Sequence, residues 1–460
     1  MVLGLVGGVS VGMLVLALSR IFPPHPYGIG SDFRVLYGAS KALAAGRDPY
    51  SSTVLLHFLQ QADPYPHQQP VLNLFAYLPV TAVLLEPLTV LPFWAAYAVL
   101  TFVGAAAAAA VTILVLRDLG WNHDRLAAGG ALISWISIQG FLYGQVDALL
   151  LAALGGSMLL AWHHRHLAAG LVLGLLWIKP DVLWPAPVFL ALALWPDRRR
   201  VAFFAGGFGV ASAAALLVSP GLLRSWWHSL VGFAAGVGTT QPRLSGLPAL
   251  QQAAPAGWGL TGHLLTPGTL AVIAVAVLAM ALFGVWLVRS GAWNGVTEVG
   301  RISWAVSVPV GIWLAATPYA HSNDDLLLVP LLMLTLGRDV RRVHGSGLWL
   351  SLGVVALLLL VWPGGVVPWP VGLAVFAGVG VACWRLRTDQ RLTGFGAGLA
   401  VLALAYLPAL GPINVVAVSL TPVAALALVV EGCRTCWMEV GGAGTGPAYA
   451  SPASRGSAPG

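Results

Sequence analysis

Charged residues are scarce in this chain: Asp, Glu, Lys and Arg make up 8% of its 460 residues, whereas soluble proteins carry about 25%. Hydrophobic residues make up 58%, and the mean hydropathy is +0.84. Apolar runs recur along nearly the whole length, and each could cross much of a hydrocarbon layer about 30 Å thick. The composition excludes a soluble protein and predicts an all-α, polytopic membrane protein.

Cysteine is also rare, and the common nucleotide and hydrolase motifs are missing. Cys383, Cys433 and Cys436 are too few for a disulfide framework, and the CxxC at 433–436 lacks the second pair that a zinc site needs. The sequence contains no P-loop, dinucleotide fingerprint, HExxH or GxSxG motif. We therefore do not expect cytosolic nucleotide chemistry.

The 23 Lys and Arg residues are scattered over many short loops, which excludes a nucleic-acid-binding stripe. Basic loops stay on the cytoplasmic side of a membrane, so their positions predict the topology. They lie at Arg117 to Arg125, His163 to His166, Arg198 to Arg200, Arg289 to Arg301, Arg338 to Arg342 and Arg385 to Arg391, followed by Arg434. Seven basic residues lie elsewhere and are candidates for binding an anion: Arg20, Arg34, Lys41, Arg47, Lys179, Arg224 and Arg243.

The apolar stretches between these loops predict a helical bundle with about 12–14 crossings. The fourteen stretches are 2–19, 93–116, 126–140, 146–162, 166–178, 182–195, 201–218, 268–288, 302–317, 325–337, 347–362, 370–384, 393–410 and 413–431. This order places both termini in the cytoplasm of a plasma-membrane protein. It leaves two long extracytoplasmic loops, 20–92 and 219–267, which we expect to carry interfacial helices.

The stretch 71–92 is apolar but contains three prolines and Glu86. Counting it as a crossing would invert every later loop, so we predict a re-entrant or interfacial segment. Residues 1–440 then form one integral-membrane domain. Gly, Ala, Ser and Pro dominate 441–460, which predicts a disordered cytoplasmic tail.

Asp32 opens the predicted first outer helix, in which Ser31 or Asp32 would be the N-cap and Gly46 the stop. By pattern alone, a helix cap and a functional carboxylate are equally good interpretations of Asp32. The topology places other polar residues on the same side: Gln145, Asp147, Lys179, Asp181, Arg243, His321 and Asp324. Taken singly, these are ordinary caps or interhelical contacts. Together they predict a site for an anionic head group and a hydroxyl nucleophile.

The order of these motifs resembles glycosyltransferase family 87, a family of GT-C integral-membrane enzymes. The likeness begins at Asp32-Phe33 and continues through Phe75 to Pro79, Gly144-Gln145, Gly170 with Gly174, Lys179-Pro180, Thr317-Pro318, His321 and Asp324-Asp325. The resemblance implies a GT-C-type fold. It also implies transfer of a sugar, commonly mannose, from a polyprenyl-phosphate donor to a lipid or glycan hydroxyl on the extracytoplasmic face, as in the synthesis of cell-envelope glycolipids.

The resemblance also implies roles for individual residues. Asp32 takes the position of the catalytic base of an inverting transfer. Lys179, Arg243 and His321 are candidates for binding the donor phosphate, with His321 alternatively orienting the acceptor. We expect the substrate site to be lined by Tyr37, Tyr77, Gln145, Asp147 and Asp324. The lipid-linked sugar is a cosubstrate, and no cofactor is expected. No metal is implied, although the additional acidic residues do not exclude a divalent ion.

Two other classes remain open at this point. Lys179, Asp181 and Glu86 could form the pathway of a transporter or lipid flippase. A ligase or polymerase of the O-antigen type also handles lipid-linked sugars, but it would concentrate its arginines and histidine in a late outer loop.

For a glycosyltransferase, the expected partners are the sugar donor, the acceptor and membrane lipids, with no nucleic acid and no obligate protein partner.

Overall fold

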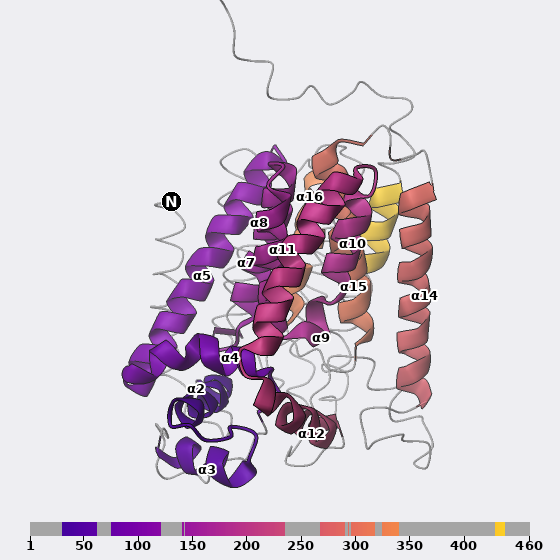
Figure 1. Cartoon of the computed structure of the whole chain (residues 1–460). Coiled ribbons are helices and arrows are strands. Elements are labelled where there is room, and N and C mark those ends of the chain that lie inside the picture. The colour runs from indigo at the N-terminus through magenta and orange to yellow at the C-terminus, as the bar shows by residue number, and fades with distance from the viewer. Residues whose placement is uncertain are drawn as a thin grey trace, which may run out of the picture.

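The structure is a computed structural model that describes residues 30–61, 75–120, 140–141, 143–234, 267–289, 293, 296–317, 324–339 and 428–437. Within these ranges the regular structure is helical, and no strand occurs. Figure 1 shows upright helices beside one another, with shorter helices gathered at one end. The predicted all-α class is confirmed for this part of the chain.

The upright helices are α5 (Phe93–Asp118), α7 (Asp147–Trp162), α8 (His166–Leu173), α10 (Pro185–Leu194), α11 (Arg198–Leu217), α14 (Pro267–Arg289), α15 (Glu298–Ala316) and α16 (Val329–Asp339). The helices gathered at one end are α2 (Ser31–Ala44), α3 (Ser52–Gln61), α4 (Pro79–Leu85) and α12 (Leu223–Ala234). Short connecting pieces are η1 (Glu86–Val90), η2 (Gly174–Ile178), α9 (Pro180–Leu183), η3 (Pro220–Leu222) and η5 (Asp324–Leu328). A further helix spans 428–437.

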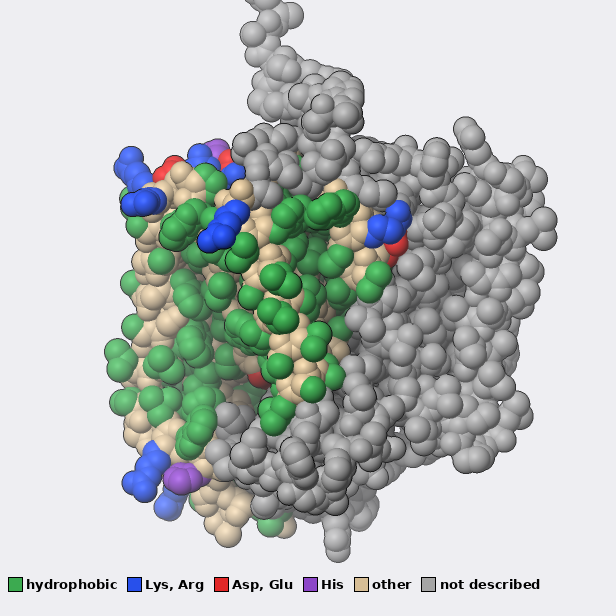
Figure 2. Space-filling model, turned by 90° about the vertical axis from the view of Figure 1, so that its right-hand side faces the viewer, with side chains coloured by type: hydrophobic (Ala, Val, Ile, Leu, Met, Phe, Trp, Pro, Cys, Tyr) green, Lys and Arg blue, Asp and Glu red, His purple; other side chains and the backbone are tan. Residues whose placement is uncertain are grey.

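Four described helices are long and apolar enough to cross a membrane: α5, α11, α14 and α15. They correspond to the predicted stretches 93–116, 201–218, 268–288 and 302–317. Large apolar side chains such as Val275, Leu278 and Leu282 are exposed on α14, and Figure 2 shows a broad hydrophobic band with Lys and Arg toward its two ends. Such a surface suits lipid rather than water. The protein is therefore a membrane protein.

The remaining predicted crossings have mixed outcomes. The stretches 146–162, 166–178, 182–195 and 325–337 are helical, but each is divided or shorter than a full crossing. Predicted crossings at 2–19, 126–140, 347–362, 370–384 and 393–410 lie wholly or almost wholly outside the described residues, as does most of 413–431. The total of about fourteen crossings stays a prediction.

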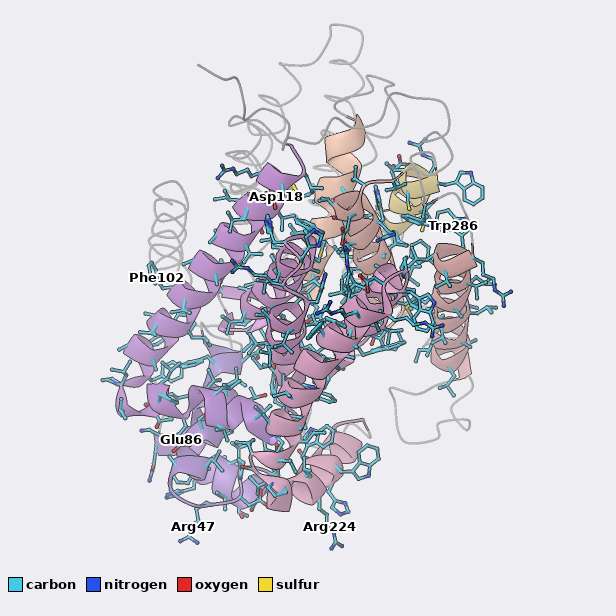
Figure 3. All side chains as sticks on the ribbon, turned by 45° about the horizontal axis from the view of Figure 1, so that its top comes forward. Arg47, Glu86, Phe102, Asp118, Arg224 and Trp286 are labelled. Carbon is cyan, nitrogen blue, oxygen red and sulfur yellow. The ribbon has the colours of Figure 1, made fainter. Side chains whose placement is uncertain are left out.

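The basic loops before α8, α11 and α15 lie together at one end of the bundle. His163 Nε2 lies 3.1 Å from Asp118 Oδ2, and this contact joins α7 to the end of α5. Arg200 Nη1 lies 2.5 Å from Glu298 Oε1, and this ion pair joins α11 to the start of α15. In Figure 3, Asp118 lies at the opposite end from Arg47 and Arg224. This grouping agrees with the prediction that these loops share one side of the membrane.

The proline-broken stretch contains only short helices in its described part. α4 has seven residues and η1 has five, too few to cross a bilayer. Pro79 opens α4, where its missing N–H is harmless, and Pro87 occupies the first turn of η1. Figure 1 shows α4 running across the direction of the bundle beside α2. This agrees with the prediction of a segment that does not cross.

Glycines allow α8 and α11 to pack with their backbones almost in contact. A Cβ at Gly170 would lie 2.2 Å from the carbonyl oxygen of Phe204, and one at Gly207 would lie 2.1 Å from that of Leu167. Small residues at such crossings are how membrane helices gain close packing. The contact matters for the site because α8 leads through η2 directly to Lys179.

Adding one methyl group at this crossing should destabilise the protein. We expect Gly170→Ala to lower the free energy of unfolding by about 1–3 kcal/mol, the usual cost of overpacking. The matched control is Gly206→Ala on α11, where a Cβ would have no neighbour within 4 Å. Thermal unfolding in detergent micelles checks the pair. Equal midpoints for the two variants would contradict the tight packing.

Candidate active site

Asp32 lies in the first turn of α2, at the end of the molecule opposite the basic loops. The N-cap is Gly30, whose φ of 74° is left-handed and therefore favours glycine. The prediction that Ser31 or Asp32 would be the N-cap is wrong, because α2 begins one residue earlier than that pattern required. The Asp32 carboxylate is instead directed to another part of the chain.

Gly144 brings the segment before α7 against α2. Its φ is 71°, and a Cβ at this position would lie 2.5 Å from the Cβ of Phe33 and 3.0 Å from the ring of Tyr97. Glycine is therefore needed both for the backbone conformation and for the close approach. The residue after this glycine is Gln145, and the contact places it beside Asp32.

Gln145 connects Asp32 to Tyr77. The Gln145 Nε2 donates a hydrogen bond to Asp32 Oδ2, and the Tyr77 hydroxyl donates to Gln145 Oε1 at 3.1 Å. The Tyr77 carbonyl in turn accepts from the Tyr50 hydroxyl at 2.7 Å. Burial raises the pKa of Tyr77 above its ordinary value, so its hydroxyl keeps its proton and stays a donor. We call these three side chains, Tyr77, Gln145 and Asp32, the carboxylate relay.

Lys179 lies where the helical run of α8 and η2 ends. Pro180 follows it and disfavours a helical conformation for the preceding residue, and the backbone of Lys179 indeed leaves the helical region, at φ −146° and ψ 75°. The Thr81 hydroxyl donates to the carbonyl of Ile178 at 3.1 Å. The break in the chain is thus held in place by α4.

The Lys179 ammonium is paired with two carboxylates. It lies 3.5 Å from Asp147 Oδ1 and also contacts Asp324 Oδ1. The residues are 6%, 1% and 0% exposed, respectively. A buried charge in apolar surroundings is tolerated only when it is paired. These three residues, called the ion cluster below, join the starts of α7, α9 and η5.

The carboxylate relay and the ion cluster belong to one site. Burial is the main cause of the raised pKa of Tyr77, and members of both groups modify it: the Lys179 ammonium lowers this pKa, and the carboxylates of Asp32, Asp147 and Asp324 raise it. Gln145 and Asp147 are also only two residues apart in the chain. Six of the nine predicted site residues are therefore brought together from five separate segments of sequence.

The start of the second outer loop covers the segment that carries Tyr77. In α12, the Trp226 indole donates to the carbonyl of Ala76 at 3.0 Å, and the Ser229 hydroxyl donates to that of Phe75 at 2.9 Å. The helix predicted for this loop is thus present, and it contributes to the site by holding the backbone of Phe75 and Ala76. Its position at the membrane interface stays a prediction.

The other predicted site residues have different outcomes. The Tyr37 hydroxyl donates to the carbonyl of Leu91 at 2.6 Å, and its ring packs on Phe93, so its described contacts join α2 to the start of α5. Arg243 and His321 lie outside the described residues. Their roles stay predictions.

The alternative interpretation of Asp147 and Asp181 as N-caps is wrong. The N-caps of α7 and α9 are Val146 and Lys179, and each aspartate lies inside the first turn. Asp147 belongs to the ion cluster, and the Asp181 carbonyl accepts a hydrogen bond from the Trp313 indole at 2.5 Å.

Within the described ranges, no three His, Cys, Asp or Glu side chains lie close enough to hold a metal ion.

Sequence reasoning missed the structural supports of the site. It identified Lys179, Asp147 and Asp324 separately but did not pair them, and it did not single out Thr81 or Trp313. A signal for the pairing was available, because a lone lysine in an apolar stretch requires a carboxylate partner. No local pattern marks a threonine or a tryptophan that bonds to a distant carbonyl.

Removing the lysine alone should destabilise the protein more than removing the whole ion cluster. We expect Lys179→Met to cost about 3–5 kcal/mol, because two buried carboxylates lose their counter-ion. The triple variant Lys179→Met/Asp147→Asn/Asp324→Asn should recover most of that loss. Thermal midpoints and the folded yield check this, with the exposed Arg47→Met as the control. A Lys179→Met variant as stable as Arg47→Met would contradict a structural ion cluster.

Comparison with known proteins adds the family. The model of glycosyltransferase family 87 matches residues 75–318, more than half of the chain. The matched region includes Tyr77, Gln145, Asp147 and Lys179, and Asp32 precedes it. No curated protein and no solved structure matches. With the helical membrane fold and the carboxylate site at one end of the bundle, this match shows that the chain belongs to glycosyltransferase family 87.

Proposed function

We propose that the protein transfers a sugar, with mannose as the expected one, from a polyprenyl-phosphate donor to a hydroxyl of a lipid or glycan on the extracytoplasmic face. Membership of family 87 establishes glycosyltransferase activity. The observation that carries the finer proposal is the Asp32 carboxylate, held by a side-chain amide at the end of the bundle opposite the basic loops. The positive-inside rule supports an extracytoplasmic position for that end.

Asp32 is the proposed general base. An acceptor hydroxyl is a weak nucleophile because its pKa is high, and a positioned carboxylate takes its proton as the oxygen attacks. The new bond forms between the acceptor oxygen and the anomeric carbon, while the bond from that carbon to the phosphate oxygen breaks. A single displacement inverts the anomeric centre. The polyprenyl phosphate leaves with the electron pair, and Asp32 holds the proton.

Arg243 and His321 are our first candidates for contact with the leaving phosphate, which needs cationic or hydrogen-bond-donating groups. Lys179 is also a candidate, but its ammonium already interacts with Asp147 and Asp324. Direct contact with phosphate would require the donor to compete with two carboxylates. We therefore assign Lys179 mainly to holding the site together.

The broken helices beside the site supply a route for the lipid chain. α4, η1, η2 and α9 are all short, and apolar side chains are exposed on the neighbouring long helices α5 and α11. A polyprenyl chain could stay in the bilayer against such surfaces while its phosphate reaches the site.

A transporter would use Lys179 and Asp181 as a pathway, but family membership does not favour that alternative.

The decisive experiment is sugar transfer from radiolabelled polyprenyl-phosphate-mannose to membrane lipid acceptors. We expect Asp32→Asn to lower the transfer rate by about 10²- to 10⁴-fold, the usual contribution of a general base. The matched control is Asp48→Asn on the same outer loop, which keeps an oxygen for its hydrogen bond to the Tyr50 amide and should stay near wild type.

Two results would change the proposal. Wild-type rates in a folded Asp32→Asn would remove Asp32 as the base while leaving the enzyme class intact. Absence of transfer by the wild type would reject the donor sugar or the acceptor. A lipid-scrambling assay would then test the flippase alternative directly.

A further inference from the structure

We propose that Gln145 is a positioning residue for Asp32 and that Tyr77 sets the orientation of its amide. This inference rests on the proposed role of Asp32 as general base. It differs from the expectation that Gln145 and Tyr77 line the substrate site, because here both act on the substrate only through Asp32.

Tyr77 determines which end of the Gln145 amide faces Asp32. A glutamine side chain has an acceptor end and a donor end, and the two have nearly the same shape. The protonated Tyr77 hydroxyl donates to Gln145 Oε1 at 3.1 Å, which turns Nε2 toward Asp32 Oδ2. The reverse orientation would place an oxygen against a carboxylate oxygen. Tyr77 therefore selects the orientation in which Gln145 is a donor to Asp32.

Gln145 is held in place by its burial, its backbone and its neighbours. The Gln145 side chain is buried, and its backbone N–H donates to the carbonyl of Gly140 at 2.8 Å. The preceding Gly144 is pressed against Phe33, the residue after Asp32. The donor Gln145 and the acceptor Asp32 are therefore both next to the contact between Gly144 and Phe33, although they are 113 residues apart in sequence. A carboxylate held this way keeps one orientation when an acceptor hydroxyl approaches.

The donor that Gln145 offers to Asp32 is a neutral amide. Such a donor orients a carboxylate without itself adding a positive charge beside it. A general base needs its negative charge in order to accept a proton, so a neutral positioning group suits this role.

The two interpretations of Gln145 predict different kinetics. A residue that binds substrate in the ground state raises KM when it is changed, whereas a residue that orients the base lowers kcat and leaves KM nearly unchanged. Gln145→Glu is the sharpest variant, because it keeps the shape of the side chain, removes the N–H donor and places a second carboxylate against Asp32. Gln60→Glu, the same change on the exposed surface of α3, is the matched control.

We expect Gln145→Glu to lower kcat by about 10- to 100-fold, the size of one charge-assisted hydrogen bond, with KM for donor and acceptor within about twofold. Tyr77→Phe should lower kcat less, and the double variant should be no slower than Gln145→Glu, because the two residues act in series. In an Asp32→Asn background, Gln145→Glu should have no further effect. A rise in KM at unchanged kcat, or additive losses in the double variant, would overturn the proposal.

An infrared measurement tests the hydrogen bond without activity. In protein labelled with ¹³C-aspartate, the difference between wild type and Asp32→Asn isolates the Asp32 carboxylate stretch. We expect this band to shift in Gln145→Glu and to stay in place in Gln60→Glu. A band that does not move overturns the proposal even if the enzyme is active. An active Asp32→Asn would instead reject the proposed role of Asp32 as the general base, on which this inference rests, so the two failures are distinguishable.

Discussion

The pairing of one buried lysine with two buried aspartates is the constraint on which the rest of the site depends. Lys179 lies between apolar helices, where an unpaired ammonium would be strongly unfavourable. Its contacts with Asp147 and Asp324 satisfy it, and they draw together the starts of α7, α9 and η5. Three parts of the chain that share no local pattern are joined by this requirement.

The surrounding packing brings Lys179 to the place where this pairing is possible. Close packing at Gly170 and Gly207 fixes α8 against α11, and α8 leads to the break before Pro180. Hydrogen bonds from Thr81 and Trp313 hold the carbonyls on either side of that break. Asp147 follows Gln145 by two residues, so the short segment that leads into α7 carries one residue of the ion cluster and one of the carboxylate relay.

Two tasks are divided between different residues of the site: the ion cluster holds the helices together, and the carboxylate relay holds the proposed base. The ion cluster keeps the helices in register and holds its cation among carboxylates. The Asp32 carboxylate accepts a hydrogen bond from the Gln145 amide, which orients it for the proposed role as a base. The leaving phosphate then needs cations from outside this cluster, and Arg243 and His321 are the proposed ones.

The sequence by itself determined the class of protein and the positions of the long apolar helices, because hydropathy depends only on the residues within each stretch. It also selected Asp32, Lys179 and the other polar residues that stand out in apolar surroundings. Only the tertiary structure decided what these residues contact. Asp32 matched a helix cap by local pattern, yet its carboxylate accepts from an amide 113 residues away, and Lys179 pairs with Asp324 across 145 residues. Such contacts depend on how helices pack, and helix packing is not a sum of local preferences.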